Sequence, residues 1–266
     1  MLVGVSTACL FPEPLEESIY QLSVNGIQCM EIFLNTQSEM KKSFAHGAAN
    51  LMKRFDVRCP SVHPFTCELE TLMFFSEYER RLTDALEYHK HYFEFMNIVG
   101  AEIFVFHGGK PGLAKNKELF AERFSRLYRL GREYGVTVAL ENVSRCMSAS
   151  SAFVRDISRI LGDEFAFVLD TKQAIRAGES PMTFLNAVGG KTVHVHISDS
   201  SELGDCLLIG SGRFDFRTFF EKLSGYNPDA SIILELYRNN FNGISDLVSS
   251  YGKLLKMTEQ YNKEKR

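Results

Sequence analysis

The chain has 266 residues, of which 45% are apolar and 24% charged, enough to bury a large core in a globular fold. Its formal net charge is −3, and no block of Lys and Arg precedes the last four residues. Because nucleic-acid backbones are bound by clustered cations, we expect no nucleic-acid partner.

The cysteines and the N-terminal residues indicate a cellular setting. Six cysteines are scattered without a Cys-x-x-Cys pair, so we expect free thiols in a reducing cytosol and no structural zinc site. Residues 2–6 are strand-like, which predicts no signal peptide. No apolar run approaches the roughly 18 residues that cross a membrane. The expected protein is cytoplasmic, with no membrane partner.

The first half of the chain predicts short apolar strands that alternate with helices. Strands are expected at residues 2–6, 29–34, 57–63 and 103–107. A first helix is expected from Pro14 to Gly26, and a second is expected to end near Arg54. A long helix over residues 77–99 should stop at Gly100.

The second half continues the alternation. Strands are expected at residues 136–142, at 165–170, around His194 and at 231–236. Helices are expected before Gly135, over residues 153–161, from about 181 to 188, over 216–223 and near the C-terminus. Eight strands and about eight helices in one series predict a (β/α)8 TIM barrel, in a single domain over residues 1–266. The alternative is an open doubly wound sheet, but the glycine-rich run it needs after the first strand is absent.

Residues that can bind a metal or move a proton close six of the predicted strands. They are His63, His107, Glu141, Asp170, His196 and Glu235. The C-terminal strand ends form the active site of such barrels. Each residue alone could be structural or solvated, but six on separate strands favour a functional site. Three converging buried carboxylates need a compensating cation, and one imidazole with three carboxylates suits Mn²⁺, Mg²⁺ or Co²⁺ better than a thiolate-type zinc site.

Five short runs together resemble the xylose-isomerase-like barrel superfamily, over nearly the whole chain. They are Ala139-Leu-Glu-Asn142, Val168-Leu-Asp-Thr171, His194-Val-His-Ile-Ser-Asp199, Gly210-Ser-Gly212 before Phe214-Asp-Phe216, and Leu234-Glu235. The superfamily includes sugar phosphate isomerases and epimerases, ketose 3-epimerases, inosose dehydratases, hydroxypyruvate isomerases and endonuclease IV.

The resemblance implies a set of site residues. It implies a divalent metal bound by Glu141, Asp170, His196 and Glu235, with Mn²⁺ favoured and Mg²⁺, Co²⁺ or Zn²⁺ as alternatives. In the epimerase branch, the residues matching Glu141 and Glu235 also act as acid and base on opposite faces of the substrate carbon. The residue matching His63, like the one matching His107, lines the substrate pocket, or binds further zinc ions in the endonuclease branch.

Two departures from the family bear on its branches. Gln173 and Cys206 stand where the family often has histidines, at positions that the trinuclear zinc cluster of endonuclease IV would use. We therefore expect no repair of abasic DNA. The Gln173 side chain can still hydrogen-bond a sugar hydroxyl, but it cannot carry a proton as histidine does.

Three further polar residues, Lys172, Arg213 and His194, are candidates for roles near the predicted site. Lys172 and Arg213 are candidate substrate-binding cations, and Arg213 follows a Gly-x-Gly loop where such barrels often hold phosphate. The alternative for both is a solvated surface cation. For His194 a structural role is favoured, with contact to a metal ligand as the alternative.

The expected function is that of a sugar or sugar-phosphate isomerase or epimerase. The substrate would be a small carbohydrate, and the step a metal-assisted proton transfer next to a carbonyl, through an enediolate. One alternative is a lyase that dehydrates a cyclic polyol by the same first step, and another is a sugar-binding barrel without turnover. The oligomeric state is left open, with a homo-oligomer allowed.

Overall fold

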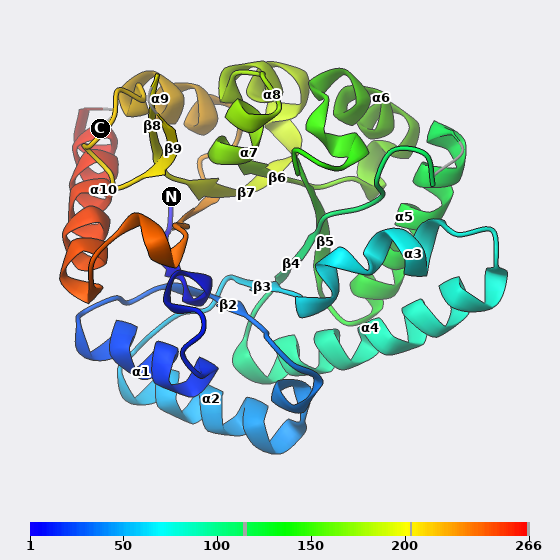
Figure 1. Cartoon of the computed structure of the whole chain (residues 1–266), viewed down its shortest axis with the longest axis horizontal. Coiled ribbons are helices and arrows are strands. Elements are labelled where there is room, and N and C mark those ends of the chain that lie inside the picture. The colour runs from blue at the N-terminus through cyan, green and yellow to red at the C-terminus, as the bar shows by residue number, and fades with distance from the viewer. Residues whose placement is uncertain (114–115, 203, 265–266) are drawn as a thin grey trace.

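Eight parallel strands close into a barrel in the computed structural model of the chain, which describes residues 1–113, 116–202 and 204–264 (Figure 1). The order around the barrel is β1-β10-β7-β6-β5-β4-β3-β2. The barrel strands are β1 (Val3–Ser6), β2 (Met30–Phe33), β3 (Ser61–His63), β4 (Ile103–Phe106), β5 (Thr137–Glu141), β6 (Phe167–Asp170), β7 (Thr192–Ile197) and β10 (Ser231–Leu234). The predicted (β/α)8 barrel is confirmed.

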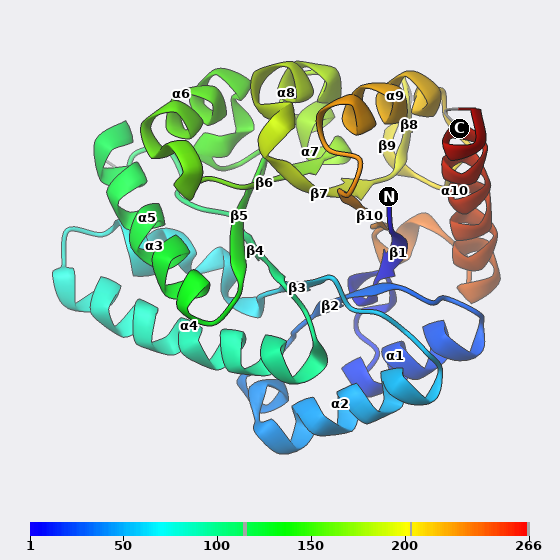
Figure 2. The same ribbon diagram turned by 180° about the vertical axis from the view of Figure 1, so that it is seen from behind.

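Helices surround the barrel in both views (Figures 1 and 2). They are α1 (Leu15–Val24), α2 (Lys42–Arg54), α3 (Glu70–Phe75), α4 (Glu79–Val99), α5 (Lys117–Glu133), α6 (Ser151–Leu161), α7 (Thr171–Arg176), α8 (Pro181–Val188), α9 (Phe216–Tyr226) and α10 (Ile244–Glu264). The last helix packs against β1, so the first strand and the last helix of the chain are neighbours. Within the described ranges, no helix has the length and apolarity needed to cross a membrane.

Local signals in the sequence explain several helix boundaries. The hydroxyl of Ser180 caps α8 by accepting the Met182 N–H, and Pro181 takes the first helical position, where its missing N–H costs nothing. Helix α4 ends at Gly100, whose φ of 78° lies in the left-handed region that glycine adopts without strain. These boundaries agree with those expected from the sequence to within about two residues.

The alternation of strand residues decides which side chains enter the barrel. Val105, Ala139 and Val168 belong to a small apolar cluster that is separate from the main core. The large side chains between them along the strands, such as Phe106 and Leu140, pack in the main core with residues of the helices. Because successive strand residues point to opposite faces, the residues two positions later, Glu141 among them, enter the interior at the C-terminal ends of the strands.

A short hairpin and two short helices were not predicted from the sequence. A two-stranded antiparallel hairpin of β8 (Asp199–Ser201) and β9 (Gly204–Leu207) follows β7. The short helices α3 and α7 follow β3 and β6. The hairpin strands are too short and polar to show alternation, and helices of six residues are too short to show helical periodicity.

Candidate metal centre and active site

Four neighbouring strand ends bring Glu141, Asp170, His196 and Glu235 into one buried cluster. One ligand atom from each lies within 4.8 Å of all the others. The Nδ1 atom of His196 is 2.9 Å from Glu141 Oε1 and 3.7 Å from Glu235 Oε2. Asp170 faces His196 directly in the β6–β7 register. The residues that the sequence predicted as metal ligands therefore meet at one point.

Asp170 is held in place by its own backbone and by the next helix. Its Oδ1 atom accepts the Gln173 N–H at 3.0 Å and so caps the N-terminus of α7. The Asn142 side chain bridges β5 and β6, accepting the Asp170 N–H at 2.7 Å and donating to the Asp170 carbonyl at 2.9 Å. These bonds fix the carboxylate and leave Oδ2 directed at the cluster, 4.0 Å from Nδ1 of His196.

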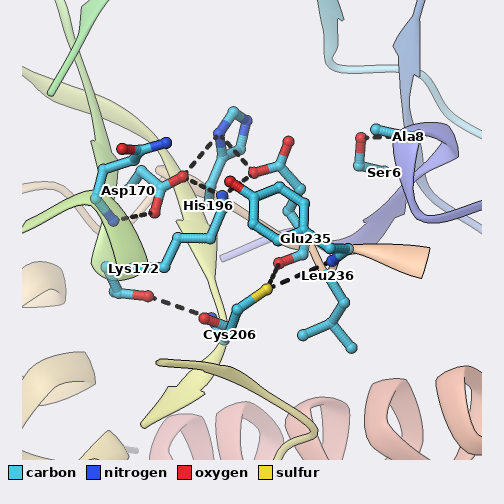
Figure 3. A network of polar contacts seen from close by, with 12 residues as sticks. Ser6, Ala8, Asp170, Lys172, His196, Cys206, Glu235 and Leu236 are labelled. Atoms are coloured by element: carbon cyan, nitrogen blue, oxygen red, sulfur yellow. Dashed lines mark hydrogen bonds and ion pairs between the residues drawn. The ribbon is translucent and has the colours of Figure 1, made fainter. Parts of the chain in front are cut away.

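The ammonium group of Lys172 lies inside this cluster, whereas the sequence predicted that this cation would lie at the open mouth of the barrel. It donates to Asp170 Oδ2 and to Glu235 Oε2 (Figure 3). Its side chain is only 3% exposed. Burial would lower the pKa of Lys172, but the two carboxylates outweigh it and hold the pKa well above its usual range. Burial also raises the pKa of Asp170, to about 6, against the opposing charge of Lys172.

A fourth buried carboxylate, Glu31 on β2, was missed by the sequence analysis. Its Oε2 atom lies 3.0 Å from His196 Nε2 and 3.1 Å from His194 Nε2, and it accepts the Ser61 hydroxyl at 2.9 Å. Burial would raise the pKa of Glu31, but His196 and His194 hold it well below its usual range. His194 therefore contacts the group that orients His196. The available signal was a single carboxylate inside the apolar run 29–34.

His63 and His107 lie next to Glu141, on the side of its carboxylate that does not face His196. The Nε2 atom of His107 is 2.9 Å from Glu141 Oε2 and 2.9 Å from His63 Nε2. Burial would lower the pKa of His107, but Glu141 raises it well above its usual range. In turn, His107 and His196 hold the pKa of Glu141 well below its usual range against the effect of burial. Cys67 stands close enough to His63 and His107 to form a second group of potential ligands.

Glu70, on α3, binds the backbone at His107. The sequence analysis did not identify this residue either. Its Oε2 atom accepts the backbone N–H groups of His107 at 2.8 Å and Gly108 at 3.0 Å. Its Oε1 atom is buried and has no hydrogen-bond partner among the described residues. Burial raises the pKa of Glu70 to about 8, so the carboxyl group holds a proton at neutral pH.

The two departures from the family pattern have structural roles. Gln173 accepts the backbone N–H of Ser144 at 3.0 Å through its side-chain oxygen, which ties the loop after β5 to α7. The thiol sulfur of Cys206 accepts the Tyr237 N–H at 3.4 Å, and the Cys206 side chain is fully buried next to the segment that carries Glu235 (Figure 3).

The backbone N–H groups of the Gly210-Ser-Gly212 loop bind an anion that belongs to the chain itself. The carboxylate of Asp199 accepts the N–H groups of Gly210 at 2.8 Å, Gly212 at 2.9 Å and Phe214 at 3.0 Å. The amides expected to assist phosphate binding are therefore already bonded to a carboxylate. Arg213, the candidate phosphate-binding cation, has an exposed side chain on this loop.

The donor set of the cluster fits a divalent cation. Three carboxylates and one imidazole form a hard, oxygen-rich set, and their donor atoms are close enough to share one ion. The second nitrogen of His196 faces Glu31, an arrangement common behind metal-bound histidines because it fixes the ring and its tautomer. A metal bound here would have to displace the ammonium group of Lys172 from two of the four donor residues.

Comparison with known proteins places this arrangement in a family. A model of the xylose isomerase-like TIM barrel matches residues 19–260. The chain belongs to the xylose isomerase-like TIM-barrel family. No curated protein matches the chain significantly.

Solved structures of similar fold are found at low sequence identity. A D-tagatose 3-epimerase-like protein superimposes with a TM-score of 0.81 at 22% identity, over 100% of both chains. D-allulose 3-epimerase from Methylomonas sp., in complex with D-allulose, gives 0.77 at 17% identity, over 96% of both chains. The IOLI protein with a bound zinc atom gives 0.79 at 17% identity, over 98% of this chain and 99% of that one. This xylose isomerase-like barrel thus shares its fold with sugar epimerases and with a zinc-binding protein.

Proposed function

We propose that this protein is a divalent-metal-dependent sugar isomerase or epimerase that moves a proton at a carbon next to a carbonyl group. The observation that carries the proposal is the approach of Glu141 and Glu235 to the same imidazole, that of His196, from β5 and from the end of β10. Inverting a carbon, or moving a proton between neighbouring carbons, requires groups that remove and return the proton. The similarity in fold to a D-tagatose 3-epimerase-like protein and to D-allulose 3-epimerase supports a ketose as the substrate class.

The metal is proposed to bind to Glu141, Asp170, His196 and Glu235, with Mn²⁺ favoured and Mg²⁺, Co²⁺ or Zn²⁺ as alternatives. A divalent cation there would supply the Lewis acidity that polarises a substrate carbonyl. Among the flanking residues, His63 and His107 are proposed to contact the sugar hydroxyls. Gln173 is proposed to assist them with its side-chain amide.

The two carboxylates are proposed to have different roles. The Glu235 side chain is 12% exposed and that of Glu141 is 4% exposed, so Glu235 is the more accessible to a substrate. We assign Glu235 as the base that removes the proton and leaves an enediolate. Glu141 is assigned as the group that returns a proton to the enediolate, with His107, whose Nε2 lies 2.9 Å from Glu141 Oε2, as its hydrogen-bond partner.

The substrate is proposed to be a sugar without a phosphate group. Phosphate sites in barrels of this kind use loop amides, and here the amides of Gly210 and Gly212 are bonded to Asp199. An added phosphate would have to compete with a carboxylate that is already in place. Unphosphorylated ketopentoses and ketohexoses are therefore the first substrates to test.

The proposal is tested by deuterium exchange from solvent into a panel of ketoses and their phosphates, in the presence of each of the four metals. On a sugar that exchanges, Glu235→Gln is expected to lose exchange by about 10²–10⁴-fold, because the base is removed while one metal-coordinating oxygen remains. Glu118→Gln is the matched control, because Glu118 is exposed on α5. Near-normal exchange in Glu235→Gln at full metal occupancy would move the base to His63 or His107.

The same experiment separates the alternatives. Exchange accompanied by loss of water from a cyclic polyol substrate would indicate a lyase. Binding of sugars without exchange would indicate a non-catalytic barrel. Asp170→Ala is expected to leave the barrel folded and to remove the bound metal, as measured by elemental analysis, and metal content independent of Asp170 would contradict the ligand assignment.

A further inference from the structure

The ammonium group of Lys172 occupies part of the proposed metal site, which the family fold by itself does not imply. Lys172 is the second residue of α7, directly after the β6 strand that ends in Asp170. Asp170 caps this helix through Oδ1, which fixes the start of α7 relative to the cluster. The lysine side chain therefore begins beside the proposed metal ligands and ends among them (Figure 3).

The ammonium group and a metal would use the same atoms. Nζ of Lys172 contacts Asp170 Oδ2 and Glu235 Oε2. These two oxygens are also the ones that approach Nδ1 of His196, at 4.0 and 3.7 Å. A divalent ion held by all three groups would lie within a few ångströms of Nζ, where two like charges repel strongly in a buried site.

We propose that Lys172 is the resident cation of this site, and that its ammonium group and a divalent metal bind Asp170 and Glu235 in competition. The inference rests on the proposed function of the same residues and adds a condition to it. The buried carboxylates are compensated by a cation of the chain itself, so the barrel folds without a metal. The metal enters when the flexible lysine side chain moves out of the cluster, which weakens metal binding by the free energy of that displacement.

The competition is tested by measuring metal affinity in three variants of the full chain. Protein treated with a chelator and dialysed is titrated with Mn²⁺ and with Zn²⁺ against a chromophoric chelator. Lys172→Met removes the charge and keeps the length of the side chain, and Lys172→Gln keeps a hydrogen-bond donor without charge. Lys191→Met is the matched control, because Lys191 forms an ion pair with Asp163 outside the cluster.

Both Lys172 variants are expected to bind the metals at least about tenfold more tightly than the wild type, within the 5–150-fold typical of coupled sites. The Lys191 variant is expected to bind them as the wild type does. The second readout is the melting temperature. The chelator should lower that of Lys172→Met by more than that of the wild type, because the more tightly bound metal stabilises the folded state more, and added metal should restore both.

Equal metal affinities in the wild type and both Lys172 variants would overturn the competition, as would the absence of metal binding in all of them. The outcome is independent of the activity test. Equal affinities together with sugar turnover would overturn this inference alone. Tighter binding in the Lys172 variants without turnover by the wild type would support it and contradict the proposed function.

Discussion

Glu70 offers a quantitative test of the electrostatics behind the site. Its carboxyl group is fully buried and accepts the backbone N–H groups of His107 and Gly108. Burial raises its pKa to about 8 from an ordinary value of 4.5. In the unfolded chain this carboxyl group loses its proton near the ordinary value. Between the two values the folded state therefore binds more protons than the unfolded state, so the stability falls as the pH rises.

The size of the effect follows from the two pKa values. Each pH unit between them lowers the free energy of unfolding by about 1.4 kcal/mol until the folded-state carboxyl group itself begins to ionise, which gives about 3 kcal/mol by pH 7 and about 4 kcal/mol by pH 8. Glu70→Gln is neutral at every pH and keeps an oxygen for the two N–H groups. The stability of this variant relative to the wild type is expected to increase with pH by these amounts.

Urea denaturation at pH 5, 6, 7 and 8, in the presence of a chelator, measures the difference between the two proteins. Effects of other titrating groups cancel in the difference, as does a constant effect of placing an amide in this position. Glu118→Gln, on the exposed face of α5, is expected to show a difference that does not change with pH. A difference between Glu70→Gln and the wild type that stays constant or shrinks with pH would refute the reasoning.

Three further predictions concern the neighbouring groups. In metal-free protein, Glu31→Gln removes the charge facing His196 and is expected to lower the pKa of that imidazole, as measured by NMR of its ring carbons; an unchanged titration would exclude the contact. Asp199→Ala leaves three loop N–H groups without their acceptor and is expected to cost about 1–3 kcal/mol in urea denaturation, with exposed Asp229→Ala as the control. The purified protein with Zn²⁺ is expected not to cleave abasic sites in duplex DNA, because histidines are absent at Gln173 and Cys206. Nicking that is lost in Glu235→Ala would show that this branch of the family was excluded wrongly.

Local patterns along the chain are sufficient to predict the barrel. Eight apolar runs with turn or helix signals between them predict parallel strands that are covered on both faces, and a closed barrel has that arrangement. Strand periodicity also predicted which side chains meet. Residues such as Glu141 and Asp170 lie two residues after a position whose side chain faces the barrel interior, so their own side chains face it too. These properties depend on local spacing, and local spacing can be read from one chain.

The compensation of the charges in the site depends on contacts between residues that are distant in the sequence. The partners of His196 come from β2 and β5, and those of Lys172 from β6 and the end of β10. The anion that binds the Gly210–Gly212 loop comes from Asp199, at the start of a hairpin that the sequence analysis missed. Which cation faces which carboxylate depends on the register and shear of the closed barrel, and on where a long side chain ends. A local pattern determines neither, and for that reason a lysine expected at the mouth lies within the proposed metal centre.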